Sequence, residues 1–501
     1  MMKAYDMIQT LQQDQLLQEI VVDGAWHYTA PEAIATLSFQ HLTYDSRDVT
    51  EGTLFICKGQ HFKREFLESA IANGATAYVA EQDYQVSIPG IIVTDVRRAM
   101  SLIAMQFYGY PQNDLKIIAY TGTKGKTTSA YFCKAIMDVA TDNHTALFST
   151  METYLDGRHA QKSLLTTPES LDLFKMMREA VDYGMTHLIM EVSSQAYKLN
   201  RVYGLTFDVG VMLNLSPDHI GPIEHPTYDD YMYCKSQLIE HSRVMILNHD
   251  MSIYTYFKEK ADALNVPTLT YGTQEGDYIF TPKAQGYFDV VDHHDHDLDG
   301  EYRIRLLGDF NQSNAVSAMI ACHCVGASPE AIVEGLNQAV VPGRMERLEK
   351  EGQPVVYVDY AHNYLSASSL LQFIKDEHPA SRLFVVLGST GNKAESRREG
   401  FGQVLSEYAD VAILTSDDPE FEDPEAIMDD IEAAMTVKKE VVRIVDRKEA
   451  IRYAIEHATA NDVVVLAGKG RDAYQHINGE RVPYEGDVTI AKKYLRIESE
   501  Q

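Results

Sequence analysis

A glycine-rich segment with two lysines is the first stretch whose residue types and spacing could do chemistry. It reads Gly122, Thr123, Lys124, Gly125, Lys126, Thr127, Thr128. The apolar run LKIIAY before it predicts a strand, and TTSAYFCKAIMDVA predicts a helix. Glycines let backbone N–H groups turn toward a phosphate, and a helix N-terminus adds partial positive charge. The segment therefore predicts a nucleotide phosphate loop; a glycine turn before a helix is the plainer alternative.

Three side chains of this loop invite separate roles. Lys126 is expected to reach the β- and γ-phosphates, and Thr127 to hold Mg²⁺. Lys124 lies inside the loop, where it either adds positive charge near the phosphates or points to solvent. The sequence leaves that choice open.

Polar clusters follow several other apolar runs of the chain. They read EVSS, NLSPDH, DYAHN, GSTGNK, SDDPE and GKGRD. In open α/β sheets, ligands bind outside the carboxyl ends of the strands, which is where these clusters are predicted to lie. This distribution favours an enzyme or a nucleotide switch with its site between two domains, over a structural protein.

The order of the predicted elements indicates an α/β protein of several domains. A chain of 501 residues is too long for one ordinary core. Strand-like and helix-like runs alternate, which implies parallel sheets, and the pattern restarts after Pro342. A smaller α/β unit precedes residue 112. We therefore predict domains over residues 1–112, 113–341 and 342–501.

The composition argues against several classes of protein. A net charge of −29 disfavours general binding to nucleic acid or anionic membranes, since both prefer basic surfaces. No apolar run approaches the roughly 20 residues of a membrane span. Residues 1–20 read as an amphipathic helix without a secretory apolar core. The five cysteines are scattered along the chain. Cys322 and Cys324 are expected to be packing residues of an apolar helix. We expect a monomer in a reducing cytoplasm.

Three classes of nucleotide-binding enzyme or switch compete at this point. DHIG, from Asp218 to Gly221, matches the D-x-x-G of a GTPase, but Glu395 stands where N-K-x-D needs an aspartate. DHIG also lies far from the loop, so we reject a GTPase switch. A phosphotransferase is compatible with the loop alone. The second α/β domain, with its own polar strand ends, favours a carboxylate–amine ligase, which must bring in an amine as third substrate.

A series of short stretches, in order along the chain, carries a family resemblance. They are YDSRDVTEGTLFICKG, TGTKGKTT, TTPES, MEVSSQAY with NRVYG, NLSPDHI, YCKSQL, GDFNQSNA, PGRME, DYAHN and DDPEFEDP. The sequence resembles the Mur ligase family of peptidoglycan precursor synthesis, in the branch that adds the third amino acid to a UDP-N-acetylmuramoyl dipeptide. The resemblance implies an N-terminal UDP-substrate domain, a central P-loop parallel-sheet ATPase domain and a C-terminal Rossmann-like domain. It also implies ATP-dependent amide formation through an acyl phosphate.

The resemblance assigns residues to ATP. Asn311 matches an asparagine on the adenine side, and Arg344 matches an arginine that reaches back to the nucleotide. Asp359 matches a further nucleotide contact. A helix cap is the alternative for Asn311, and a polar strand end is the alternative for Asp359.

The resemblance also assigns residues to Mg²⁺. Glu191 and His219 match metal ligands, although a lone histidine is more often structural. Lys235 matches a lysine that CO₂ carbamylates, which turns a cation into an anion able to support Mg²⁺; by its context alone it is a polar helix position. Many relatives carry D-H-L-D-x-H-G where this chain reads DHIGPIEH, so Glu224 or His225 is the expected substitute for the missing acid.

The UDP-linked dipeptide is expected to meet two groups of residues. Ser46 is expected at its uridine end. Thr166, Thr167, Ser193 and Arg201 are expected at its muramoyl-dipeptide end, since hydroxyls and an arginine suit an anionic substrate. The threonine pair could equally cap the helix predicted from PESLDLFKMM.

The identity of the added amino acid is expected to depend on the last domain. Its candidate residues are Lys393, Asp417, Asp418, Pro419, Glu420 and Asp472. Relatives that add diaminopimelate carry D-N-P-R, whose arginine meets the distal carboxylate. Here the tetrad from Asp417 offers three carboxylates and no arginine, so unpaired negative charge is expected to favour a distal ammonium. The resemblance implies L-lysine, with Lys393 on its α-carboxylate and Glu420 as a candidate solvated turn.

Two alternatives to a lysine ligase stay open. Ornithine or meso-diaminopimelate could be the added amino acid, because charge does not count methylenes. An ATP-gated binding or scaffold protein is the alternative from another class.

One histidine-rich stretch has no place in the family pattern. VVDHHDHDLDGEY alternates histidine and aspartate before a D-G turn. A metal site is one interpretation of it, and a solvated hairpin loop is the interpretation that we favour.

Overall fold

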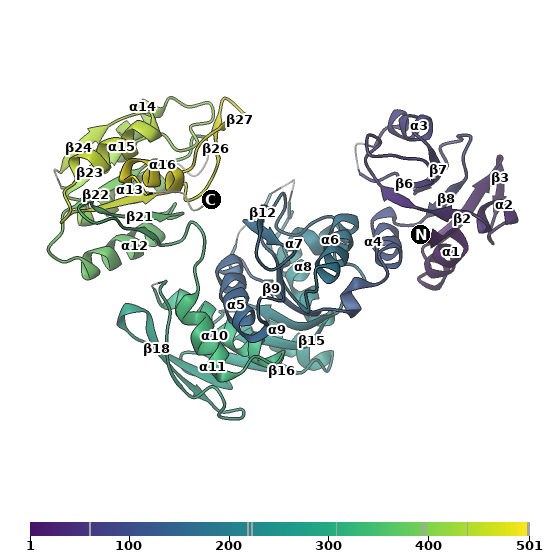
Figure 1. Cartoon of the computed structure of the whole chain (residues 1–501), viewed down its shortest axis with the longest axis horizontal. Coiled ribbons are helices and arrows are strands. Elements are labelled where there is room, and N and C mark those ends of the chain that lie inside the picture. The colour runs from purple at the N-terminus through teal and green to yellow at the C-terminus, as the bar shows by residue number, and fades with distance from the viewer. Residues whose placement is uncertain are drawn as a thin grey trace. The chain divides into compact units, whose positions relative to one another are not determined.

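The computed structural model describes residues 1–59, 62–217, 220–221, 224–306, 308–392, 396–437 and 439–497. The chain divides into two compact units. The first comprises Met1–Arg303 and Gln312–Ala339, and the second comprises Ile304–Asn311 and the chain from Val340 onward. Both consist of sheets covered by helices (Figure 1), so the predicted α/β class is confirmed.

The first unit starts with a six-stranded sheet. Its elements are β1 (Met2–Lys3), α1 (Ala4–Gln13), β2 (Leu17–Val22), β3 (Ala25–His27), α2 (Glu32–Ala35), β4 (Ser38–Phe39), β5 (His41–Thr43), β6 (Thr53–Ile56), α3 (Arg64–Ala72), β7 (Ala75–Ala80), β8 (Gly90–Val93) and α4 (Val96–Phe107). The strand order is β3-β2-β8-β7-β6-β5, with β5 to β8 parallel. Helices α1 and α4 pack on one face and α3 on the other.

The prediction of one helix over residues 1–20 is wrong in its second half. Helix α1 stops at Gln13, and β2 follows from Leu17. Gln15 takes a left-handed φ of 57°, which breaks the helix. Ile20 and Val21 are buried in the sheet, where β-branched side chains pack well.

An eleven-stranded sheet forms the rest of the first unit. The elements from here to the end of the unit are β9 (Lys116–Thr121), α5 (Lys126–Thr141), β10 (Thr145–Phe148), β11 (Glu152–Tyr154), β12 (Ala160–Lys162), α6 (Ser170–Asp182), β13 (His187–Glu191), α7 (Ser194–Lys198), β14 (Phe207–Met212), α8 (Tyr228–Glu240), β15 (Ser242–Asn248), α9 (Tyr254–Ala263), β16 (Thr268–Gly272), β17 (Tyr278–Pro282), β18 (Tyr287–Asp292), β19 (Gly300–Arg303), α10 (Asp309–Cys324) and α11 (Pro329–Gln338). The strand order is β12-β11-β10-β13-β9-β14-β15-β16-β17-β18-β19. The strands from β10 to β17 in this order run parallel, which places their carboxyl ends at one edge.

Alternate residues of the central strand β9 face the two helical layers. Ile117 and Ala119 belong to the core that also holds α6, α8 and α9. Tyr120 points the other way, where its hydroxyl lies 3.0 Å from Cys133 Sγ of α5. Because both faces are covered, the strand reads as a continuous apolar run, as expected for a buried parallel strand.

The second unit contains a six-stranded sheet. Its elements are β20 (Glu346–Leu348), β21 (Val355–Asp359), α12 (Tyr364–Glu377), β22 (Leu383–Leu387), α13 (Ser396–Tyr408), β23 (Val411–Leu414), α14 (Pro424–Ala433), β24 (Glu440–Arg443), α15 (Arg447–His457), β25 (Val463–Ala467), β26 (Tyr474–Ile477), β27 (Glu480–Pro483) and α16 (Asp487–Leu495). The order is β20-β21-β25-β22-β23-β24, and only β20 pairs antiparallel within that sheet. Helices α12, α13 and α14 cover one face, and α15 and α16 the other.

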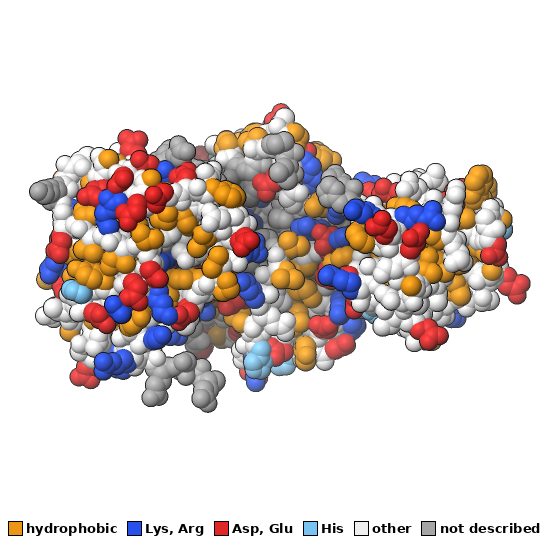
Figure 2. Space-filling model, turned by 90° about the horizontal axis from the view of Figure 1, so that it is seen from above, with side chains coloured by type: hydrophobic (Ala, Val, Ile, Leu, Met, Phe, Trp, Pro, Cys, Tyr) orange, Lys and Arg blue, Asp and Glu red, His pale blue; other side chains and the backbone are white. Residues whose placement is uncertain are grey.

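The surface carries both signs of charge. Figure 2 shows acidic and basic side chains mixed with hydrophobic ones over the face in view. In the described part of the chain, no helix combines the length and the apolar character needed to cross a membrane.

One fully buried ion pair joins two helices of the second unit. Arg447, at the start of α15, donates from Nε and Nη2 to the carboxylate of Asp487, at the start of α16, at 2.9 and 2.7 Å. Arg447 Nη2 also donates to Ala467 O, and the Tyr484 hydroxyl donates to Asp487 Oδ1 at 2.7 Å. Neither charged side chain is exposed, so each depends on the other for compensation.

Replacing Arg447 by leucine is expected to destabilise the second unit by about 3–5 kcal/mol, because the Asp487 charge stays buried without its partner. The loss of stability is expected to appear as faster hydrogen exchange of the β25 backbone amides, measured by mass spectrometry. Arg452→Leu on the same helix is the control, since its ion pairs with Glu449 and Glu456 are exposed. Equal exchange in both variants would contradict the expected role of the buried pair.

Candidate active site

The predicted phosphate loop connects β9 to α5. Gly122 and Gly125 take φ values of 154° and 87°, and Gly125 is the residue that precedes the helix. The N-terminus of α5 therefore opens directly from the loop, as a phosphate site requires. Lys126 Nζ donates to the carbonyl oxygens of Gly122 and Thr123 at 2.9 and 3.3 Å. Its ammonium thus lies over the loop.

Neighbouring segments hold the loop in this shape. Asn214, after β14, accepts from the Lys124 N–H at 2.9 Å and donates to the Lys124 carbonyl at 2.9 Å. The Thr123 N–H donates to Asn214 O at 3.0 Å, and the Thr123 and Tyr231 hydroxyls lie 3.1 Å apart. The Lys124 backbone is therefore anchored while its side chain is exposed. The sequence offered no signal for Asn214 beyond its position at a strand end.

Glu191 ends β13 beside the loop and is fully buried. Its Oε1 accepts from the Thr127 hydroxyl at 2.9 Å and from the Thr150 N–H at 2.8 Å. Its Oε2 accepts from the Thr150 hydroxyl at 2.9 Å. Thr127 and Glu191, both predicted for Mg²⁺, are thus in direct contact, and their oxygen atoms are the hard ligands that Mg²⁺ prefers. Thr150 is a contact that sequence reasoning missed.

Lys235 of α8 points at the same loop. The residue is 2% exposed. Nζ donates to Gly122 O at 2.9 Å and lies 3.4 Å from Thr121 Oγ1. It also lies 4.9 Å from the ring centroid of Tyr231. Lys235 therefore lies on a helix, as its context predicts, and its amine is buried at the phosphate loop.

Two predicted residues, His219 and Lys393, lie outside the described residues. His225 is one expected substitute for the missing acid. It is buried in the first unit, where both of its ring nitrogens contact other side chains. Its Nδ1 lies 2.7 Å from Asp230 Oδ2, and its Nε2 lies 2.8 Å from Ser194 Oγ. Both ring nitrogens are thus engaged in structural hydrogen bonds.

The four residues predicted for the muramoyl-dipeptide end lie close to Glu191. Thr167 Oγ1 donates to Glu191 O at 2.9 Å and lies 3.4 Å from Ser193 Oγ. The Thr150 and Thr166 hydroxyls lie 3.1 Å apart. Arg201 Nη1 lies 3.3 Å from Thr167 O. The structure therefore brings these residues together at one edge of the sheet.

The alternative of a threonine cap is wrong. The residue preceding α6 is Glu169, and its side chain makes no capping hydrogen bond. A serine of the set does cap a helix, because Ser193 Oγ accepts from the Ala196 N–H at the start of α7.

Glu169 instead gathers three cations. Lys58 lies 2.6 Å away, Arg201 2.8 Å and Arg97 3.6 Å, measured between charged nitrogen and carboxylate oxygen. Burial acts to raise the pKa of Glu169, but Lys58 and Arg201 outweigh it and hold that pKa below its usual value. The cluster carries two more positive charges than negative ones, which suits an anionic ligand. Ser46 lies in the same N-terminal part and accepts at its carbonyl from Asn73 Nδ2 at 3.0 Å.

In the second unit, an acidic cluster surrounds one buried lysine. Lys469, which is 1% exposed, lies 2.8 Å from Asp418, 3.6 Å from Asp472 and 3.7 Å from Asp417. The expectation of unpaired negative charge is therefore wrong in one respect, because Lys469 of GKGRD neutralises part of it. The nearby carboxylates outweigh burial and raise the pKa of Lys469, so its amine stays charged. Three carboxylates around one ammonium still leave two negative charges.

One carboxyl of this cluster, that of Asp417, has a raised pKa. Burial raises the pKa of Asp417 to about 6, against the opposing effect of Arg447 and Lys469. Glu420 follows Pro419 with a left-handed φ of 52°, and its N–H donates to His476 O at 3.0 Å. The tetrad from Asp417 to Glu420 is thus a structured turn, which places the carboxylates of Asp417 and Asp418 next to the Lys469 ammonium.

The remaining nucleotide candidates are Arg344, Asp359 and Asn311. Arg344 Nη1 is 3.9 Å from Asp359 Oδ1, and Asp359 accepts from the Met345 N–H at 2.8 Å. Burial raises the pKa of Asp359. Asn311 is buried at the third residue of α10, so it is not the residue that precedes the helix.

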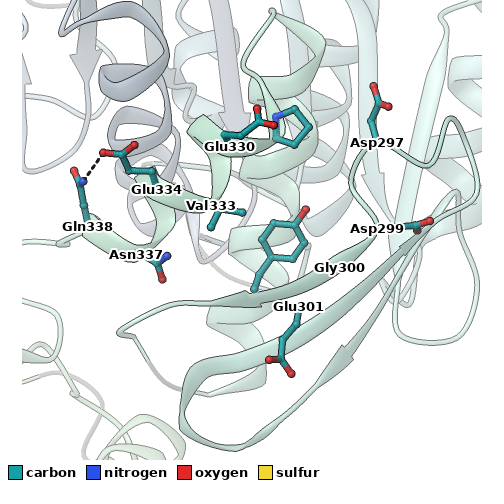
Figure 3. A pocket seen from close by; sticks show the side chains of 11 residues that line it. Asp297, Asp299, Gly300, Glu301, Glu330, Val333, Glu334, Asn337 and Gln338 are labelled. Atoms are coloured by element: carbon teal, nitrogen blue, oxygen red, sulfur yellow. Dashed lines mark hydrogen bonds between the residues drawn. The ribbon is translucent and has the colours of Figure 1, made fainter.

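A pocket of about 600 Å³ lies between the β18–β19 hairpin and α11 (Figure 3). Its charged lining residues are Asp297, Asp299, Glu301, Glu330 and Glu334. Phosphate groups would be repelled by this lining, so the phosphate loop and not this pocket is the candidate nucleotide site.

Comparisons with known proteins identify the family that the chain resembles along its length. A family model described as "Mur ligase middle domain" matches residues 120–322, and one described as "Mur ligase, glutamate ligase domain" matches residues 343–470. A UDP-N-acetylmuramoyl-L-alanyl-D-glutamate--L-lysine ligase of Enterococcus faecalis is 52% identical over 97% of both chains. A UDP-N-acetylmuramyl-tripeptide synthetase of Lactococcus lactis subsp. cremoris is 49% identical over 99% of this chain and 100% of its own. The solved structure of a UDP-N-acetylmuramoyl-L-alanyl-D-glutamate--2,6-diaminopimelate ligase matches 99% of both chains, with a TM-score of 0.69 and 27% identity.

Gly125→Ala tests the phosphate loop. The added Cβ would lie 2.4 Å from Asn314 Oδ1, at a residue with a φ of 87°. Left-handed strain alone costs about 1–2 kcal/mol, so we expect the affinity for ADP, measured by calorimetry, to fall by about tenfold or more. Gly326→Ala is the control. Gly326 follows the C-terminal end of α10 and has a φ of 108°, so alanine is also strained there, but its Cβ would meet no atom within 4 Å. Unchanged ADP affinity in Gly125→Ala would contradict the site.

Proposed function

The chain belongs to the Mur ligase family, and from that premise we propose that it adds L-lysine to the D-glutamate of UDP-N-acetylmuramoyl-L-alanyl-D-glutamate, with ATP. The observation that carries the proposal is the 52% identity, over 97% of both chains, to a ligase named for this reaction. The chemistry of the described site supports it, since a phosphate loop lies beside hydroxyls and an arginine that suit an anionic substrate.

The reaction joins a carboxylate to an amine in two steps. A carboxylate oxygen of the substrate attacks the γ-phosphorus of ATP, the bond to the β–γ bridging oxygen breaks, and ADP leaves. The resulting acyl phosphate is then attacked by the amine of lysine, which loses a proton as inorganic phosphate leaves and the amide forms. Lys126 and the N–H groups of the loop stabilise the negative charge on the phosphates. Holding three reactants in one place lowers the entropic part of the barrier.

Thr127 and Glu191 would hold Mg²⁺, with His219 as a further ligand by family resemblance. Their observed contact at 2.9 Å and their hard oxygen atoms fit such an ion. Bound Mg²⁺ would neutralise charge on the phosphate oxygens. The buried amine of Lys235 is proposed to be carbamylated: its nitrogen lone pair adds to CO₂ and one proton leaves, so a carbamate anion forms next to the loop.

The UDP-linked dipeptide is proposed to bind along the N-terminal part of the site. Ser46 would meet its uridine end, and Thr166, Thr167, Ser193 and Arg201 would meet its dipeptide end. The excess of positive charge around Glu169 supports this assignment. Asn311, Arg344 and Asp359 would contact the nucleotide.

The acidic cluster of the second unit is proposed to select the amino acid. Asp417, Asp418 and Asp472 leave two negative charges after Lys469 is counted. A distal ammonium would be attracted to this charge and a distal carboxylate repelled. Lys393 would meet the α-carboxylate, and Pro419 and Glu420 would shape the turn.

The proposal includes the cellular setting and the domains. All five cysteines are free, which supports a reducing cytoplasm. We also propose that the protein is a monomer, with domains over residues 1–112, 113–341 and 342–501.

Phosphate release is expected only when ATP, the UDP-linked dipeptide and an amino acid are all present. In a panel of amino acids, kcat/KM for lysine should exceed that for meso-diaminopimelate by about 100-fold or more, because like charges in contact cost several kcal/mol. Ornithine, one methylene shorter, should be about tenfold or more worse than lysine. Phosphate release that does not depend on the UDP-linked dipeptide or the amino acid would favour a nucleotide-gated binding protein. A higher kcat/KM for diaminopimelate than for lysine would overturn the lysine assignment.

Lysine use is expected to weaken as pH falls through about 6. The raised pKa means that Asp417 is charged above about pH 6 and neutral below it. At saturating ATP and UDP-linked dipeptide, kcat/KM for lysine should fall by about tenfold per pH unit below that pKa. Asp417→Asn, with lower activity at neutral pH, should lack this inflection. A parent profile that is flat from pH 5 to 7 would contradict the role of Asp417.

A further inference from the structure

The histidine-rich loop between β18 and β19 meets the end of α10 in a cluster of ligand-type atoms. His323 Nε2 lies 3.7 Å from Asp295 Oδ2 and 3.7 Å from Asp297 Oδ2. The three ligand atoms lie within 4.8 Å of one another. The cluster is separate from the phosphate loop, since β18 is five strands from β9 in the sheet.

The proton of the His323 ring is assigned by its other contact. Nδ1 lies 3.3 Å from Ala327 O, and a carbonyl oxygen can only accept. Nδ1 therefore carries the proton, and the lone pair of Nε2 in the neutral ring faces two carboxylate oxygens. Metal-binding histidines commonly donate their other N–H to a backbone carbonyl in this way. Three acceptors that face one another repel, and a cation bound between them removes that repulsion.

The loop holds its carboxylates in place before any ion binds. Asp292 accepts from the N–H groups of His294, Asp295 and Leu298, and its own N–H donates to Asp299. Asp295 Oδ1 accepts from the Asp297 N–H at 3.2 Å, which leaves Oδ2 directed at His323. A site ordered in advance loses little entropy on binding an ion.

We propose that Asp295, Asp297 and His323 bind a divalent cation of borderline hardness, with Zn²⁺ as the representative ion. An imidazole with two carboxylates suits such ions better than Mg²⁺ or Ca²⁺, which prefer oxygen ligands alone. Bonds of about 2.0–2.2 Å in a tetrahedral zinc site place ligand atoms about 3.3 Å apart, close to the 3.7 Å found here. Both aspartates are exposed, so water can complete the coordination.

The adjoining acidic pocket supports this site. Asp297 lines that pocket, and Figure 3 shows it on the hairpin side together with Asp299 and Glu301. Negative charge of one sign raises the local concentration of cations. The bound ion would join the hairpin loop to the C-terminal end of α10, so its effect is on stability and not on the ligation step.

Calorimetric titration of the full chain with ZnCl₂, without nucleotide, tests the proposal. We expect the parent to bind one more equivalent of Zn²⁺ than His323→Gln, and Asp297→Asn to weaken that equivalent by about tenfold or more. His293→Gln is the matched control, because this exposed histidine of the same loop is not in the cluster. Unchanged ligase activity in His323→Gln shows that the variant is folded.

Co²⁺ supplies a second readout. Its d–d absorption should appear in the parent and in His293→Gln, and should be lost in His323→Gln. Zn²⁺ should raise the Tm of the parent more than that of His323→Gln, and Mg²⁺ in tenfold excess should not displace it. Equal Zn²⁺ stoichiometry in the parent and in His323→Gln, or no Zn²⁺ bound by the parent, would overturn the proposal.

Discussion

The buried carboxylate of Glu191 is the constraint on which the first unit depends. A charged group away from water costs several kcal/mol unless it is paired or fully hydrogen-bonded. Glu191 meets this need with donors from two other segments, Thr127 at the start of α5 and Thr150 after β10. Its own carbonyl accepts from Thr167. One carboxylate thereby aligns the phosphate loop with the neighbouring strand ends, and the same oxygen atoms suit Mg²⁺.

The two ligand regions use the same electrostatic arrangement with opposite signs. Around Glu169, three cations surround one anion, which leaves an excess of positive charge where we propose that the UDP-linked substrate binds. Around Lys469, three carboxylates surround one ammonium, which leaves an excess of negative charge where we propose that the diamino acid binds. In each case the single counter-charge keeps the cluster stable without the ligand and leaves an excess that the ligand can neutralise. In our account, specificity for lysine follows from the excess of negative charge around Lys469, and not only from the absence of an arginine in the tetrad.

Much of the fold could be predicted because its signals are local. The buried strands read as apolar runs, and the glycine loop has a distinctive spacing, so β9, α5 and the sheet class followed from sequence. Thr127 was predicted from the loop motif and Glu191 from the family resemblance, and the two side chains are in contact. Asn214, Thr150 and Lys469 could not be predicted, because their roles arise from side chains brought together across the sheet. The end of α1 was missed for a related reason: a left-handed Gln15 overrides an amphipathic pattern.

The central claim is that a substrate carboxylate, and not water, attacks the γ-phosphate held by the loop. A UDP-linked dipeptide with both oxygens of its reacting carboxylate labelled with ¹⁸O tests it directly. Incubated with ATP and lysine, the enzyme should release inorganic phosphate that carries one ¹⁸O atom per molecule, as seen by mass spectrometry. Unlabelled phosphate, released at the rate of tripeptide formation, would contradict an acyl phosphate and with it the account of this site.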